Sequence, residues 1–203
     1  NGFRALACNT TASENTASGY AAMQENTTGC ENSAFGRKAM CCNTTGFNNT
    51  AVGMAALLAN STGCYNTAVG NLTLVNVTNA ERNTAVGYNA LNDVTTGDDN
   101  VAVGIYAGDA ITEAGDNVLV GKEAGTTLTT GPQNVFIGSE AGESADTTGY
   151  TIAIGSDAYK TAAAGNYNIA IGKNAMNNAL VTTSFAIGIG YQTLKEITSA
   201  TET

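Results

Sequence analysis

The stretch Asn83-Thr84-Ala85-Val86-Gly87-Tyr88-Asn89-Ala90-Leu91 decides the fold, because its elements return along nearly the whole chain. The same Asn-Thr-Ala-Val-Gly sequence stands at 49–53 and at 66–70, 17 residues apart each time. Outward from these copies, a glycine recurs every 17 residues, and Gly188 follows after 16. The repeat glycines are Gly2, Gly19, Gly36, Gly53, Gly70, Gly87, Gly104, Gly121, Gly138, Gly155 and Gly172.

A period of 17 residues is too short for a helix–turn–helix repeat or a propeller blade, but it suits one turn of a β-solenoid. We therefore predict an all-β parallel β-solenoid of about twelve 17-residue coils over residues 1–190. Residues 191–203 are expected to form an exit segment and a possible start of a coiled-coil neck. Stacked coils would be hydrogen-bonded at a spacing of about 4.8 Å.

Within a coil, the alternation of a strand separates Thr84 and Val86 from Asn83 and Ala85. We expect the Val86 side to face the core and the small Ala/Gly side to face a neighbouring chain. A second short strand is expected at Asn89–Leu91. The corner Thr95-Thr96-Gly97 is expected to use the positive φ that glycine tolerates.

Asparagine shares one position of the repeat in nine units, with Thr151 as the interruption. Stacking predicts an amide ladder, in which each side chain bonds the next. The ladder residues are Asn15, Asn32, Asn49, Asn66, Asn83, Asn100, Asn117, Asn134 and Asn168.

Two further positions trade volume along the repeat. Thr84, three residues before its glycine, goes with a large Leu91 four residues after it, whereas Val118 goes with Gly125. A close-packed interior requires such compensation if both side chains share one space. Ile152 with Tyr159 departs from the pattern, which suggests different packing there.

Composition and charge exclude several functions. Charged residues make up 12% of the chain, there is no His, and the net charge is −9. Residues 1–91 carry four bases and four acids, so the whole excess lies in residues 92–203, with four bases and thirteen acids. An acidic surface repels phosphate, which argues against a nucleic-acid partner. The chain has no apolar run long enough for a spanning helix, and we expect no membrane insertion by this segment.

The candidate chemistry is sparse. Without His the usual general base is missing, so we predict no enzyme, no catalytic residue and no cofactor. Asp98, Asp99, Asp109 and Asp116 are expected at solvated corners, where calcium is the one metal their oxygen atoms would suit. Sequons such as that of Asn43 are interpreted as by-products of the Asn-Thr-Thr corner.

The cysteines fall into rows of the repeat. Cys8 and Cys42 share one position and Cys30 and Cys64 another, in each case two coils apart. Two coils span about 9.6 Å, more than the roughly 7 Å that a disulfide allows between Cα atoms. We expect free thiols, with interchain bridges as the alternative. Free thiols favour assembly in a reducing compartment.

The sequences Asn168-Ile169-Ala170-Ile171-Gly172 and Thr151-Ile152-Ala153-Ile154-Gly155 resemble the head repeat of trimeric autotransporter adhesins. Residues 83–91 also resemble repeats of phage tail-fibre proteins. The resemblance implies a left-handed parallel β-roll in which three chains pack side by side. It also implies an extracellular place, on a virion tail fibre or a cell surface.

These observations predict a structural or adhesive fibre segment that forms a homotrimer and binds a cell-surface receptor or glycan. A spacer shaft with no ligand is the main alternative. Ice binding is the alternative from another class, but its flat arrays need Thr-x-Thr, whereas Thr95 and Thr96 are adjacent and would point apart.

Overall fold

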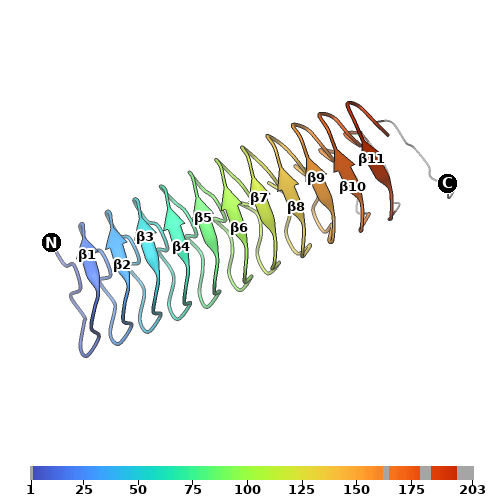
Figure 1. The fold of residues 1–203 in the computed structure, drawn as a ribbon. Coiled ribbons are helices and arrows are strands. Elements are labelled where there is room, and N and C mark those ends of the chain that lie inside the picture. Colours follow the sequence, from blue (N-terminus) through green and yellow to red (C-terminus); the bar gives the residue numbers. More distant parts are fainter. Residues whose placement is uncertain (1, 162–164, 179–183, 196–203) are drawn as a thin grey trace.

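The computed structural model describes residues 2–161, 165–178 and 184–195. Over these residues the chain winds into a straight rod whose strands lie side by side in sequence order (Figure 1). The strands, of three residues each, are β1 (Thr16–Ser18), β2 (Ser33–Phe35), β3 (Thr50–Val52), β4 (Thr67–Val69), β5 (Thr84–Val86), β6 (Val101–Val103), β7 (Val118–Val120), β8 (Val135–Ile137), β9 (Ile152–Ile154), β10 (Ile169–Ile171) and β11 (Ile187–Ile189).

All neighbouring strands pair in parallel, and the register follows the repeat. Thr84 lies opposite Val101 and Ala85 opposite Ala102, an offset of 17 residues. The predicted all-β parallel β-solenoid is therefore confirmed. The last coil is one residue longer, since Ile169 pairs with Ile187. Gly190, with φ +124°, consequently takes the place of the repeat glycine, and the prediction of Gly188 for that place was wrong.

The strands face the opposite way from the prediction. Ala85 is fully buried, whereas Val86 is 36% exposed. The same holds from β2 to β11, where the central residue is buried and its two neighbours are partly or fully exposed. The reason is parity: the side chain of Asn83 must lie inside to complete its hydrogen bonds, and Ala85 shares its side of the strand. The small residues thus face the core, and the β-branched residues face outward.

The wall opposite the sheet is built from turns, so the predicted second strand at Asn89–Leu91 was wrong. Asn89 has φ 55° and Leu91 φ 48°, both in the left-handed region. The wall is still hydrogen-bonded between coils. The N–H of Leu91 donates to the carbonyl of Ala107 at 3.0 Å, and the N–H of Asn89 donates to that of Asn71 at 3.2 Å. Alternating left- and right-handed residues therefore bond laterally to both neighbouring coils.

The predicted volume compensation occurs, but the turn-wall residue is compensated by the strand centre and not by the residue before it. Val118 lies on the outer face, and the residue that compensates Gly125 is the buried strand centre Leu119. A Cβ added to Gly125 would lie 3.0 Å from a Leu119 methyl and 3.2 Å from the Phe136 ring. Tyr159 is no exception once the correct position is used, because its strand centre is the small Ala153.

The repeat glycines combine two constraints. Gly87 has φ +137°, which disfavours any other residue. A Cβ there would also overlap the carbonyl oxygen of Gly104 in the next coil. The corner glycine Gly97 differs from the prediction, since it does not take a positive φ. It is small because a Cβ would overlap the carbonyl of Ala114.

Candidate functional surfaces

The outward face of the sheet is a regular surface that runs from β1 to β11. From β6 to β11 both outward residues of every strand are Val or Ile. In β3 to β5 they are Thr and Val. No outward strand residue of the described sheet is charged. We call this surface the strand face; its C-terminal part is Val101, Val103, Val118, Val120, Val135, Ile137, Ile152, Ile154, Ile169, Ile171, Ile187 and Ile189.

The asparagines of the predicted ladder form a buried line of hydrogen bonds. The backbone N–H of Asn100 donates to Oδ1 of Asn83 at 3.0 Å, and its Nδ2 donates to the same oxygen at 3.1 Å. Nδ2 of Asn100 also donates to the carbonyl of Ala114 at 2.9 Å in the following coil. The row is continuous across Thr151, whose backbone N–H donates to Oδ1 of Asn134 and whose hydroxyl accepts from the N–H of Asn168. These side chains act as structural links between coils.

A second, shorter asparagine row was missed by the sequence reasoning. Nδ2 of Asn43 donates to Oδ1 of Asn26 at 2.7 Å, and Nδ2 of Asn60 donates to Oδ1 of Asn43 at 2.9 Å. The row stops because the next coil has Val77 at this position, which leaves the buried Oδ1 of Asn60 without a donor. The Asn-Thr-Thr sequons contained the signal. Asn26 and Asn43 of these sequons are buried, which is incompatible with glycosylation in the folded coil, whereas Asn9 in the first coil is exposed.

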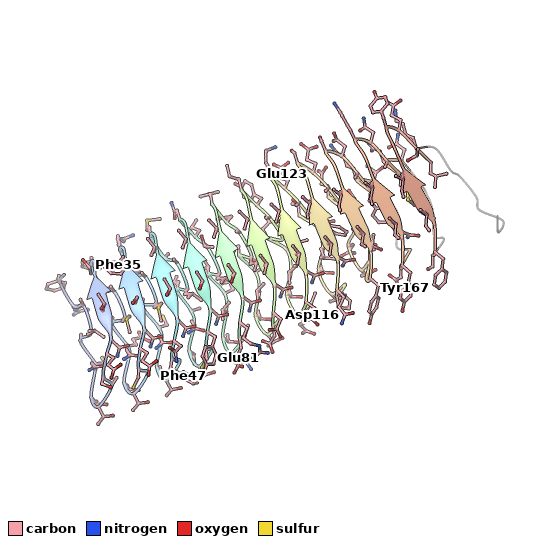
Figure 2. The ribbon with its side chains drawn as sticks, viewed as in Figure 1. Phe35, Phe47, Glu81, Asp116, Glu123 and Tyr167 are labelled. Atoms are coloured by element: carbon pink, nitrogen blue, oxygen red, sulfur yellow. The ribbon has the colours of Figure 1, made fainter. Side chains whose placement is uncertain are left out.

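The acidic residues proposed for calcium do not gather into one site. Among the described residues, no group of three or more Asp, Glu, His or Cys side chains is arranged to hold a metal ion. Asp98 and Asp99 instead contact Arg82, whose guanidinium bonds Asp99 at 2.7 Å and 3.0 Å. The hydrogen bonds from Arg82 lower the pKa of Asp99. Asp116 lies on the same long edge of the rod (Figure 2).

Asp109 has an unusual environment. Its Oδ1 is buried without a hydrogen-bond donor among the described residues. Burial raises the pKa of Asp109 to about 6, and the nearby carboxylates of Asp93 and Glu123 add to the effect. Glu143, at the same position two coils later, has Lys160 at 3.3 Å. The contrast makes Asp109 a carboxyl whose charge opposes folding near neutral pH.

All five cysteines are free thiols, as predicted. Cys41 belongs to neither predicted row; it is buried beside Cys42. Burial raises the pKa of Cys42 to about 11, and the carboxylate of Glu25 contributes. A raised pKa keeps the thiol protonated and therefore weakly nucleophilic.

Aromatic rings gather along one corner of the rod, immediately before the strands. Figure 2 shows Phe47, Glu81, Asp116 and Tyr167 along this edge. Phe47 and Tyr65 meet edge to face at 5.2 Å between ring centroids. Further along, Tyr167 stacks on Tyr150 at 4.9 Å and on Phe185 at 5.2 Å. Sequence reasoning did not single out these rings, although Tyr65, Tyr150, Tyr167 and Phe185 share one position of the repeat and Phe47 lies one residue before it.

A hollow of about 590 Å³ lies at the N-terminal end, lined by residues such as Leu6, Asn15 and Ala17 of the first coil. It is the uncovered end of the solenoid interior. Among the described residues, no helical segment has the length and hydrophobicity that a membrane span requires.

No protein-family model, no curated protein and no solved structure matches the chain.

Proposed function

We propose that this chain is a rigid segment of a homotrimeric fibre outside the cell, such as a virion tail fibre or a surface adhesin, and that it serves attachment. The observation that carries the proposal is the strand face. It is uncharged from β1 to β11 and consists of Val and Ile from β6 onward. A large ordered apolar surface on a single chain is typical of a protein–protein interface.

The composition of the rest of the chain supports self-association through this face. Residues 92–203 carry thirteen acids and four bases, and none of those that the structure describes lies on an outward position of a strand. Charge is therefore kept away from the apolar face in the half of the chain where that face is most apolar. Such a separation suits packing of the strand face against another copy, with the charged corners left in water.

Threefold association fits the thin interior of a coil and the resemblance of the repeat to trimeric adhesin heads. The β5 coil encloses the small strand centre Ala85 and the large side chain Leu91, and the β8 coil encloses the large strand centre Phe136 opposite Gly142. Three rods packed by their strand faces would add a second, shared core. In this arrangement the predicted interface of Ala51 and Gly53 is replaced by Thr50 and Val52, because the alanine lies inside the coil.

A structural rather than catalytic role is supported by the uniform cross-section. The described coils have almost constant length, so the walls carry no large insertion around which a cleft could form. The same uniformity favours the alternative of a spacer shaft with no ligand of its own. The adhesive role predicts that the isolated segment binds to host cells, and the spacer role predicts that it does not.

The assembly is tested by light scattering of the whole chain. We expect three times the mass of one chain. Val103→Asp combined with Ile137→Asp should give monomers that keep the β-sheet circular dichroism, whereas Thr96→Asp at an exposed corner should stay trimeric. A stable monomer of the unmodified chain would refute the assembly.

Attachment is tested separately, by measuring binding of the labelled trimer to candidate host cells. Saturable binding supports the adhesive role, and absence of binding to any cell supports the spacer.

A further inference from the structure

Three aromatic rings form an ordered exposed stack at the C-terminal part of the corner. The rings of Tyr150 and Tyr167 are 12° from parallel, and those of Tyr167 and Phe185 are 2° from parallel. Their exposed fractions are 44%, 48% and 75%. The backbone beneath them is fixed, since the N–H groups of Tyr150, Tyr167 and Phe185 donate to the preceding coils at 3.0 to 3.2 Å.

The fold does not require aromatic residues at this position. Every coil has a left-handed residue there, and the other coils use side chains as different as Glu14, Asn48, Arg82 and Gln133. Because acidic, amide, basic and aromatic side chains all occur at this position, the backbone conformation does not determine the side-chain type. The backbone conformation therefore does not account for three consecutive rings at this position.

The residues next to the rings carry no charge, although the half of the chain that contains them has thirteen acids. The one acid of these corners, Asp146, accepts a hydrogen bond from the hydroxyl of Thr129 at 2.7 Å. We call this surface the neutral corner; it consists of Pro132, Gln133, Gly149, Tyr150, Asn166, Tyr167, Ser184 and Phe185. An ionic ligand would find no countercharge here, and an anionic polymer would be repelled by the net charge of −9.

The size of the stack limits the partner. A buried aromatic side chain covers about 150–250 Å², and these rings are roughly half exposed, so three of them offer on the order of 300 Å². A stable protein–protein interface buries about 1,200–2,000 Å². The ridge by itself is too narrow for a protein partner, and it lies on the corner two residues before the strands β9, β10 and β11.

We propose that the neutral corner binds an uncharged glycan chain that lies along the rod. The C–H groups of a sugar pack against aromatic surface, and its hydroxyls bond the phenol oxygens of Tyr150 and Tyr167. Stacking holds the rings in place before binding, which lowers the entropy lost on association. The inference rests on the proposed attachment function and names the chemical class of its receptor.

The experiment uses the whole chain in native gels that contain a neutral polysaccharide (mannan, galactan or dextran) or the acidic polymer alginate. Retardation by at least one neutral polymer is expected, unchanged between low and high salt because no ionic contact is involved. The triple variant Tyr150→Ala, Tyr167→Ala, Phe185→Ala should have an affinity at least about tenfold lower, because several ring contacts are lost. The matched control, Phe47→Ala with Tyr65→Ala, should bind like the unmodified chain.

Three results would overturn the proposal. They are no retardation in any neutral polysaccharide, retardation that survives the triple variant, and retardation in alginate alone. A triple variant that changes the oligomeric mass would show that the rings contact another copy, which also overturns it. The proposed fibre function is judged by mass and cell binding. If the triple variant binds cells as well as the unmodified chain does, the glycan site is rejected and the attachment role is retained.

Discussion

Exchange of a large and a small side chain between the two walls of one coil gives the sharpest test of the core. In the β8 coil, Phe136 fills the interior and Gly142 faces it from the turn wall, where a Cβ would overlap the Phe136 ring. In the β5 coil the same two positions hold Ala85 and Leu91. Replacing Phe136 by Ala and Gly142 by Leu would thus recreate a pairing that the solenoid already uses.

Each change alone should be costly. Phe136→Ala leaves a cavity and should cost about 3–5 kcal/mol. Gly142→Leu drives a side chain into the ring and should cost about 1–3 kcal/mol or more. The backbone is not an obstacle, because Gly142 has φ +63° and Leu91 has φ 48°.

The double variant should regain most of both losses, with a coupling of several kcal/mol where independent sites would add within about 0.5 kcal/mol. Urea unfolding followed by circular dichroism measures the four free energies of the cycle. The control pair is Phe136→Ala with Gly108→Leu, two coils apart. The loss of unfolding free energy in this double variant should equal or exceed the sum of the two single losses. Additive energies for Phe136 and Gly142 would refute the shared interior.

Three further predictions concern the facing of the strands, the asparagine row and one carboxyl. Ala85→Asp should bury an unpaired charge and cost several kcal/mol, whereas Val86→Asp should leave the monomer stable and weaken self-association; equal thermal shifts for the two would contradict the assigned facing. Asn100→Ala should cost about 2–5 kcal/mol in urea unfolding, because it leaves two or more buried backbone groups unpaired; a loss below 1 kcal/mol would show that water replaces the side chain. The folded pKa of Asp109 lies near 6, above its unfolded value, because of burial and Asp93. The folded state therefore binds the extra proton, and stability should fall by about 1–2 kcal/mol, after allowance for solvent screening, as pH rises from 4 to 7. Asp109→Asn should remove this pH dependence, and an unchanged profile would reject the assignment.

The period of the sequence was enough to predict the stacking, because a constant 17-residue spacing allows only one register between coils. The facing was mispredicted because hydrophobicity was given more weight than parity. Val86 is more apolar than Ala85, but Ala85 shares its side of the strand with Asn83, whose amide is satisfied only inside. The end of the repeat was also readable. Ile187-Gly188-Ile189-Gly190 aligns with Ile169-Ala170-Ile171-Gly172, which places Gly190 and not Gly188 at the repeat position.

The turn wall was harder to predict, because left-handed backbone at Leu or Met has no signature in the side chain. Only the coils with Gly108, Gly125 and Gly142 at this position contain a hint, since glycine commonly marks a positive φ. The aromatic stack and the second asparagine row are visible as rows only once the coil is folded correctly. Their contacts, such as 2.7 Å between Asn43 and Asn26, depend on stacking that the sequence implies but does not orient.

Different constraints act on the interior and the exterior residues of this solenoid. The residues that packing within the chain does not constrain are the candidates for function. Inside, side-chain volume and hydrogen bonds are matched between neighbouring coils, as where Leu119 and Leu91 fill the space beside Gly108, so the interior residues are constrained by the neighbouring coil. Outside, the strand face changes from Thr and Val to Val and Ile at β6, while acids accumulate at the corners in the same half of the chain. Packing within one chain cannot explain that coincidence, because neither set of side chains lies in the core. The proposed association of strand faces would account for it, because an apolar face covered by other copies needs charged corners to keep the assembled rod soluble.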